Sequence, residues 1–235
     1  MESTPYFSRR VDRHLKQCER IRINIKRAKR RDFMRSTFGA TKHRYKIGPP
    51  ASPSLVLDYE AICKISLPNE YAAFLNFVGL APRSKDMWSV MAGPYYGVWT
   101  LPGLTDEIIS GLNLSPAFSS STTASEWREF AARFDAIYNN SRWEADNFEQ
   151  QKFMKLEKEY DKDLHNGLLP LCSLGCCLSA NLVLVGKDKG TVVYLDDDSP
   201  TPWMFTGLRF LDWYEAWLDD VLSGGLECKF PTYDL

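Results

Sequence analysis

The chain has 235 residues, of which 44% are hydrophobic and 25% charged, a composition typical of a folded soluble domain and unlike that of a disordered or fibrous chain. Its formal net charge is −1, but positive and negative residues are distributed unevenly along the chain. Residues 1–48 contain 15 Lys or Arg and 4 Asp or Glu, which gives +11, whereas residues 49–235 contain 14 and 26, which gives −12. The pattern predicts a basic N-terminal arm joined to an acidic body.

The sequence indicates no membrane span and a reducing compartment. No apolar run approaches the roughly 18–20 residues that cross a bilayer, and the first residues lack the apolar core of a secretory signal. The six cysteines include no Cys-x-x-Cys pair and only three histidines accompany them, so a zinc site is not expected. We expect a cytoplasmic protein in which Cys176 and Cys177 are reduced and buried.

Residues 8–32 are predicted to form a basic amphipathic helix. Its apolar positions recur at helical spacing and are Val11, Leu15, Cys18, Ile21, Ile25 and Ala28. Three uses stay open for this segment: docking onto the chain's own acidic body or onto a partner protein, binding of nucleic acid through the cations of residues 9–31, and contact with an anionic membrane surface. Glycines and prolines between residues 37 and 53 predict a linker. We therefore divide the chain into residues 1–48, a helical arm and linker, and residues 49–235.

The body alternates helical and extended patterns. A helix is expected from Pro68 to Gly79, two short strands within 88–101 around a Gly93-Pro94 turn, and a short helix at 104–112. Two amphipathic helices, 126–139 and 142–165, form a helical insert of about 115–165. Apolar segments 168–174, 178–185 and 191–195 predict strands, with a turn at 187–190 and a short edge strand at 202–205. The fold class predicted is α+β, with a mainly antiparallel sheet packed by helices.

A final helix is expected within residues 207–225. Its apolar stripe predicts packing against the sheet and consists of Phe210, Leu211, Tyr214, Trp217, Leu218, Val221 and Leu222. Carboxylates occupy the other face, and Gly224 and Gly225 favour a left-handed helix end.

Three consecutive carboxylates, Asp196, Asp197 and Asp198, follow the third predicted strand. Three readings compete: a divalent-cation site, a solvated turn, and an electrostatic contact for a basic partner. Successive strand residues point to opposite faces, which disfavours convergence on a metal ion. No phosphate-binding glycine motif is present, and His165 has no nucleophile at a recognisable spacing. We therefore expect no catalytic residue, metal or cofactor, and no enzyme.

Three motifs in order resemble the SUKH superfamily, the Smi/Knr-type domain. The first is a helix start with Leu67, Pro68, Tyr71, Phe74 and Leu75. The second is a strand block with Pro170, Gly175, Leu182, Val183, Gly190, Val192 and Tyr194. The third is a closing helix with Phe210, Trp213, Trp217 and Leu218. The resemblance covers about residues 55–223, and the basic arm and the helical insert depart from it.

The resemblance implies a single α+β domain without common catalytic residues, and a bacterial immunity protein, or antitoxin, that neutralises a polymorphic toxin in competition between bacteria. A nucleic-acid-targeting toxin is usually basic, which would suit the acidic body. The alternatives are a regulatory or scaffold module that binds another protein, and nucleic-acid binding led by the arm. The predicted partner-binding residues are acidic side chains together with one tryptophan expected at an exposed strand edge: Asp196, Asp197, Asp198, Trp203, Asp212, Glu215, Asp219 and Asp220.

Overall fold

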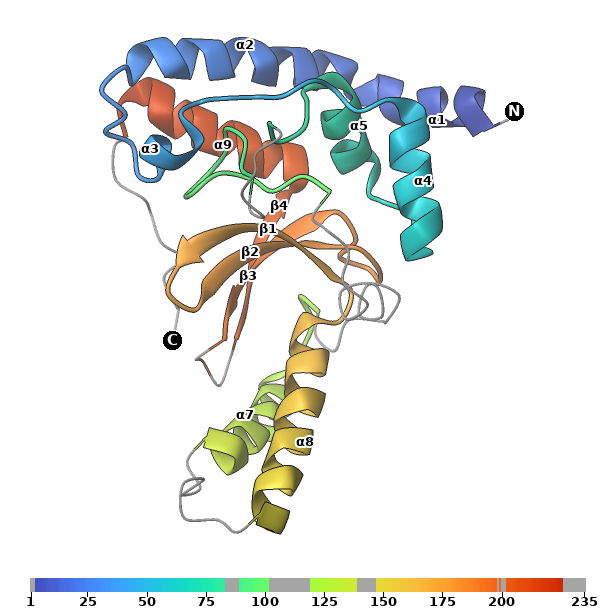
Figure 1. Cartoon of the computed structure of the whole chain (residues 1–235), viewed down its shortest axis with the longest axis vertical. Helices are drawn as coiled ribbons and strands as arrows, with labels where there is room; N and C mark the ends of the chain where they lie inside the picture. Colours follow the sequence, from blue (N-terminus) through green and yellow to red (C-terminus); the bar gives the residue numbers. More distant parts are fainter. Residues whose placement is uncertain are drawn as a thin grey trace.

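The computed structural model describes residues 3–82, 89–101, 119–138, 147–197, 199 and 202–225. These residues form three layers: a group of helices, one sheet, and a pair of helices on the other side of the sheet (Figure 1). The N-terminal part is helical. Its elements are α1 (Ser3–Val11), the short η1 (Asp12–His14), α2 (Leu15–Arg31), α3 (Ala40–His43), α4 (Pro53–Cys63) and α5 (Asn69–Phe77).

The sheet has four antiparallel strands in sequential order, β1 (Leu168–Gly175), β2 (Leu178–Val183), β3 (Thr191–Asp196) and β4 (Trp203–Arg209). In the central register Asn181 lies opposite Val193, which in turn lies opposite Phe205. The predicted α+β class and the three main strands are confirmed. The fourth strand is longer than the short edge strand that the sequence indicated.

Alternation along the strands divides the sheet into two buried faces. Leu182 and Val192 contribute to the large core under the helices, whereas Val183 and Val193 contribute to a second, smaller cluster on the opposite face. A strand whose residues are buried on both faces is expected to be largely apolar, as Ala180, Leu182 and Val183 of β2 are, although Ser179 and Asn181 interrupt the run.

The helix α9 (Phe210–Ser223) follows β4 directly and lies between the sheet and α2 (Figure 1). It packs on α5 through aromatic rings: the Phe210 ring centroid lies 5.0 Å from that of Tyr71 and 5.1 Å from that of Phe74. It ends at Gly224, which adopts the left-handed conformation at φ 94°. The predicted core role of this helix and its glycine stop are confirmed.

The helices α7 (Ala124–Tyr138) and α8 (Asn147–His165) form a hairpin that projects from the other side of the sheet (Figure 1). Where the hairpin meets the sheet, Phe130 and Tyr160 stack with ring centroids 4.5 Å apart. Leu164 and Trp203 belong to the same cluster. The two helices predicted for the insert are therefore present, and their inner ends cover the second face.

The N-terminal helices pack on the body. Side chains of the predicted stripe, Cys18, Ile21, Ile25 and Ala28, are fully buried and belong to the large core together with α5, α9 and one face of the sheet. Of the uses considered for this stripe, docking onto the chain's own body is the one observed.

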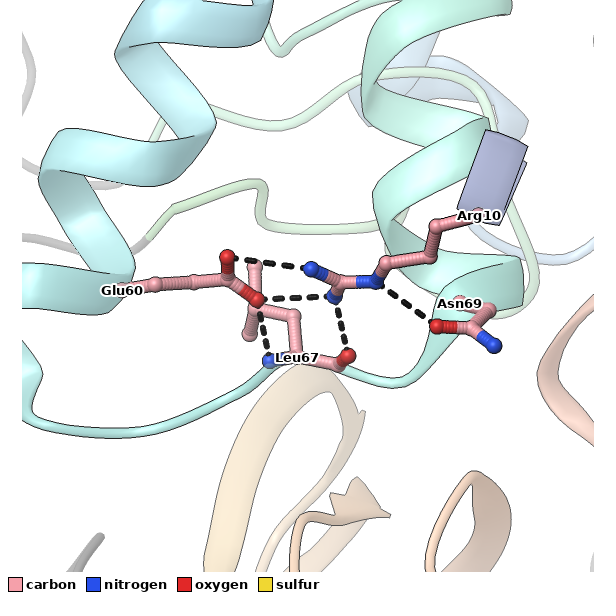
Figure 2. A network of polar contacts seen from close by, with 4 residues as sticks. All are labelled: Arg10, Glu60, Leu67 and Asn69. Carbon is pink, nitrogen blue, oxygen red and sulfur yellow. Dashed lines mark hydrogen bonds and ion pairs between the residues drawn. The ribbon is translucent and has the colours of Figure 1, made fainter. Parts of the chain in front are cut away.

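A buried ion pair fixes the start of this segment (Figure 2). The Arg10 guanidinium donates to both carboxylate oxygens of Glu60, at 2.7 and 3.1 Å, and to the side chain of Asn69 at 2.7 Å. It also donates to the carbonyl of Leu67, whose own N–H donates to Glu60 at 2.6 Å. The network joins α1 to α4 and to the loop that begins α5.

Three local expectations are corrected. The segment predicted as a linker contains the short helix α3 and is followed by α4, a helix that the sequence does not predict. Ser52 caps α4, because its hydroxyl accepts from the Leu55 N–H at 3.2 Å. Between residues 89 and 101 a single bridge pairs Met91 with Val98, and the turn there runs from Pro94 to Gly97. Cys176 is exposed at the β1–β2 turn and Cys177 is half-buried, because both occupy the hairpin end. The helix expected at 104–112 lies outside the described residues.

Candidate functional site: an aromatic cavity beside α9

A cavity of about 210 Å³ opens between α9, the sheet and two loops. It is lined by residues from segments more than 150 positions apart. Its walls carry five aromatic side chains and one carboxylate: Phe38, Tyr95, Tyr194, Trp213, Trp217 and Asp220. We call this site the aromatic cavity.

The wall formed by α9 follows from helical spacing. Trp213 and Trp217 are four residues apart and Asp220 is three further on, so the three side chains share one side of the helix. Trp213 is buried while Trp217 and Asp220 are half-buried, which places this row at the margin between core and surface. The same row therefore supplies both aromatic surface and a carboxylate to the cavity.

Hydrogen bonds fix the opposite wall. The indole N–H of Trp213 donates to the hydroxyl of Tyr194 at 3.1 Å, and the hydroxyl of Tyr95 donates to the same oxygen at 2.9 Å. The Tyr95 and Tyr194 rings meet edge to face with centroids 5.9 Å apart. Because the three polar tips satisfy one another, their rings are held in place to line the cavity.

The loop after α2 closes a third side, through Thr37 and Phe38. Phe38 contacts Tyr96 with ring centroids 5.0 Å apart. The neighbouring Gly39 has φ 74°, and a Cβ there would lie 1.8 Å from the carbonyl oxygen of Tyr95. Only glycine allows this approach of two backbones, so the N-terminal segment forms an integral wall of the cavity.

Asp32, at the end of α2, organises that loop. Its carboxylate accepts from the N–H of Ser36 at 2.6 Å, from the N–H of Thr37 at 3.1 Å and from the Tyr45 hydroxyl at 2.7 Å. Burial alone would raise the pKa of Asp32, but these hydrogen bonds to its charged form outweigh burial and hold the pKa below the usual value.

Behind Trp217 lies an aromatic layer. Tyr45 stacks on its ring at 6.2 Å between centroids, and His43 meets it edge-on at 5.7 Å. Burial lowers the pKa of His43 to about 4, so the imidazole is neutral at physiological pH. Its Nδ1 accepts from the Tyr45 N–H at 3.0 Å. His43 is therefore a supporting residue of the cavity wall, and a proton-transfer role has no geometric basis.

The cavity has the chemistry of a cation site. Aromatic ring faces carry negative potential and attract ammonium or guanidinium groups, by about 0.5–2 kcal/mol for each good contact. A carboxylate in the same lining adds direct charge attraction. The volume suits one side chain better than a drug-sized ligand, for which pockets of roughly 300–1,000 Å³ are usual.

Two of the predicted acidic residues are engaged by the chain itself. Gln17 of α2 donates to Asp212 at 2.9 Å and to Glu215 at 2.8 Å, and Arg20 pairs with Glu215 at 3.1 Å. These contacts use the first half of α9 to dock α2. In the second half of α9, Asp220 is half-buried and lines the cavity, whereas Asp219 is exposed and is not among the lining residues.

The strand-end carboxylates lie at a different place. Asp196 ends β3, and Asp197 lies 3.9 Å from His165 at the end of α8. Asp198 lies outside the described residues. Asp196 thus lies beside the start of β4, whereas α9 follows the other end of that strand.

The predicted exposure of Trp203 is wrong. This tryptophan was expected at an exposed strand edge, but 4% of its surface is exposed and its indole N–H donates to the carbonyl of Leu164 at 2.9 Å. The α7–α8 hairpin covers the face of the sheet on which Trp203 lies. A partner therefore has no access to this side chain while the hairpin is in place.

Across the described ranges, no group of three or more His, Cys, Asp or Glu side chains is arranged to hold a metal ion. In the same part of the chain, none of the helices combines the length and apolarity that membrane crossing requires.

The cavity could not be found from the sequence. The sequence places Tyr194, Trp213 and Trp217 at core or motif positions, and it predicts a linker around Phe38 and a pair of short strands around the Gly93-Pro94 turn beside Tyr95. The available signal was an unusual density of aromatic residues at 95–99 and 210–217. It did not reveal that the two segments face each other.

Comparison of the chain with protein-family models, with curated proteins and with solved structures found no match.

Proposed function

We propose that this chain is a non-catalytic immunity protein of the SUKH type, which neutralises a basic toxin by binding it. The observation that carries the proposal is the aromatic cavity with Asp220 in its lining, a site suited to an inserted lysine or arginine side chain. Buried aromatic and arginine contacts are the usual energetic centres of protein interfaces. The partner would thus be held by one anchored cation, and the net charge of −12 on residues 49–235 would attract a basic protein.

The proposed family assignment draws support from how its motif residues pack. Tyr71 and Phe74 from the first motif contact Phe210 from the third, and Leu182 and Val192 from the second share the same core. Motifs that belong to one domain are expected to meet in this way, even though about 140 positions separate Tyr71 from Phe210.

Binding to the toxin domain encoded by the neighbouring gene tests the proposal. We expect Asp220→Lys to weaken the complex by about 10- to 100-fold, because a new positive charge would repel an inserted cation. Asp58→Lys, at an exposed position on α4, is the matched control and should leave the affinity within about twofold. Isothermal titration calorimetry, together with survival of cells that express the toxin, measures both.

Two results would contradict the proposal, each in a different way. Absence of a complex between the unaltered protein and the toxin would remove the immunity function. A complex that tolerates Asp220→Lys but is weakened by Asp196→Lys with Asp197→Lys would keep the function and move the binding surface to the end of β3.

A further inference from the structure

The outer surface of α2 bears a concentration of positive charge that the docking of the arm leaves unused. Six exposed cations form what we call the cationic ridge: Arg22, Lys26, Arg27, Lys29, Arg30 and Arg31. None of the six forms an ion pair with any described residue. Glu19 is the one acidic residue on the helix itself. The helix α2 lies on the outer side of α9 (Figure 1). Arg31, at the end of the ridge, reaches the C-terminus of α9, where its guanidinium lies 3.3 Å from the position that a Cβ on Gly224 would take.

Helix geometry arranges these charges in rows. Arg22, Lys26 and Arg30 follow one another at intervals of four residues, so adjacent side chains start about 5–6 Å apart on the same face. Arg27 and Arg31 form a second row beside them. Like charges at this spacing destabilise a helix by about 0.2–0.5 kcal/mol for each pair.

Stabilisation of the helix end explains the presence of only some of the six cations. Cations in the last turn interact favourably with the helix dipole, which applies to Lys29, Arg30 and Arg31. Arg22 and Lys26 lie outside that turn and gain nothing from it. Arg20, by contrast, shows what a structural cation on this helix does, since it pairs with Glu215.

We propose that the cationic ridge binds the phosphate backbone of a nucleic acid without sequence preference. Rows of Lys and Arg bind phosphates by releasing condensed counterions. The exposed Phe33, with 77% of its surface accessible, follows the ridge and provides a ring on which an unpaired base can stack. This inference is independent of the proposed immunity function.

The same observations disfavour a membrane surface. A helix that lies in a lipid interface immerses an apolar face, but the apolar stripe of α2 is buried in the protein core. Of the exposed apolar side chains nearby, Ile23 lies among cations on α2, whereas Phe33 and Met34 follow the end of the helix, so they form no continuous apolar face along it. The ridge therefore offers charge without an apolar face to insert.

The test is fluorescence anisotropy with the full chain and a labelled oligonucleotide of about 20 nucleotides, single-stranded and as a duplex. With about six phosphate contacts, we expect affinity to fall roughly 10³-fold between about 50 and 200 mM salt. Arg22→Glu with Lys26→Glu and Arg30→Glu should abolish measurable binding. The neutral variant with glutamine at the same positions should reduce the salt-dependence slope by about 3. Preference for the single strand would assign a role to Phe33.

The matched control reverses three exposed lysines on α8, Lys155, Lys158 and Lys162, which changes the net charge equally. It should bind nearly as the unaltered protein does, and circular dichroism should show that all variants are folded. No binding at about 50 mM salt, or an equal loss in the control, would overturn the proposal. So would binding to phosphatidylserine vesicles but not to oligonucleotides, or salt-sensitive self-association that covers the ridge with the acidic body of a second copy.

Discussion

Replacing Glu60 with alanine is expected to lower the free energy of unfolding by about 3–5 kcal/mol. The side chains of Arg10 and Glu60 are 9% and 10% exposed, so the guanidinium that remained would be a buried charge without its counterion. The Leu67 N–H would lose its acceptor at the same time. Both penalties arise because the groups were removed from water when α1 docked.

Urea denaturation followed by circular dichroism measures this loss. Asp58→Ala is the matched control, since Asp58 lies on the same helix α4 but is exposed, and its effect should stay within about 0.5 kcal/mol. Replacing both partners, Arg10→Met with Glu60→Leu, should recover part of the stability because no charge is left unpaired. Equal midpoints for Glu60→Ala and Asp58→Ala would show that the ion pair does not hold α1 on the body.

The second large effect is expected at Ile25. This side chain is buried in the core between α2 and the body, and Ile25→Asp would place an unpaired carboxylate there. We expect a loss above about 4 kcal/mol, enough to unfold a domain of ordinary stability. Thermal unfolding and the near-ultraviolet circular dichroism of the tryptophans report it.

Ile23→Asp provides the comparison within the same helix. Ile23 is 58% exposed, so the same substitution two residues away should change stability by less than about 1 kcal/mol. If α2 were a detached arm, the two variants would behave alike and both would retain the near-ultraviolet signal. A large difference between them requires that one face of α2 be buried.

The elements that could be predicted from the sequence are those with a local pattern. The apolar runs of β2 and β3, and the stripes of α2 and α9, follow periods of two and 3.6 residues that any chain segment carries within itself. The glycines after α9 mark its end for an equally local reason. Strand order also follows, because short connections join antiparallel neighbours.

What could not be predicted depends on contacts between distant segments. Gln17 meets Asp212 across 195 positions, and no local pattern states that α2 covers α9. The burial of Trp203 depends on the α7–α8 hairpin. The strand β4 lies at the edge of the sheet, but the hairpin covers the face from which Trp203 projects. The aromatic cavity has the same origin, since its walls come from four separate segments of the chain.

Both proposals rest on the docking of the N-terminal helices. The segment that follows α2 supplies Thr37 and Phe38 to the aromatic cavity, and the burial of Ile21 and Ile25 directs the cationic ridge outward. The chain is thus expected to separate two binding functions, a site for a basic protein beside α9 and a surface for phosphates on the outside of α2.

Native-state hydrogen exchange of the unaltered protein tests this docking most directly. The amides of Ile21, Ile25 and Ala28 in α2 are expected to exchange only through global unfolding, with the same protection as those of Tyr214 and Leu218 in α9. Exchange of the α2 amides near the rate of an unstructured peptide, while α9 stays protected, would show that the N-terminal helices are detached and would contradict the account.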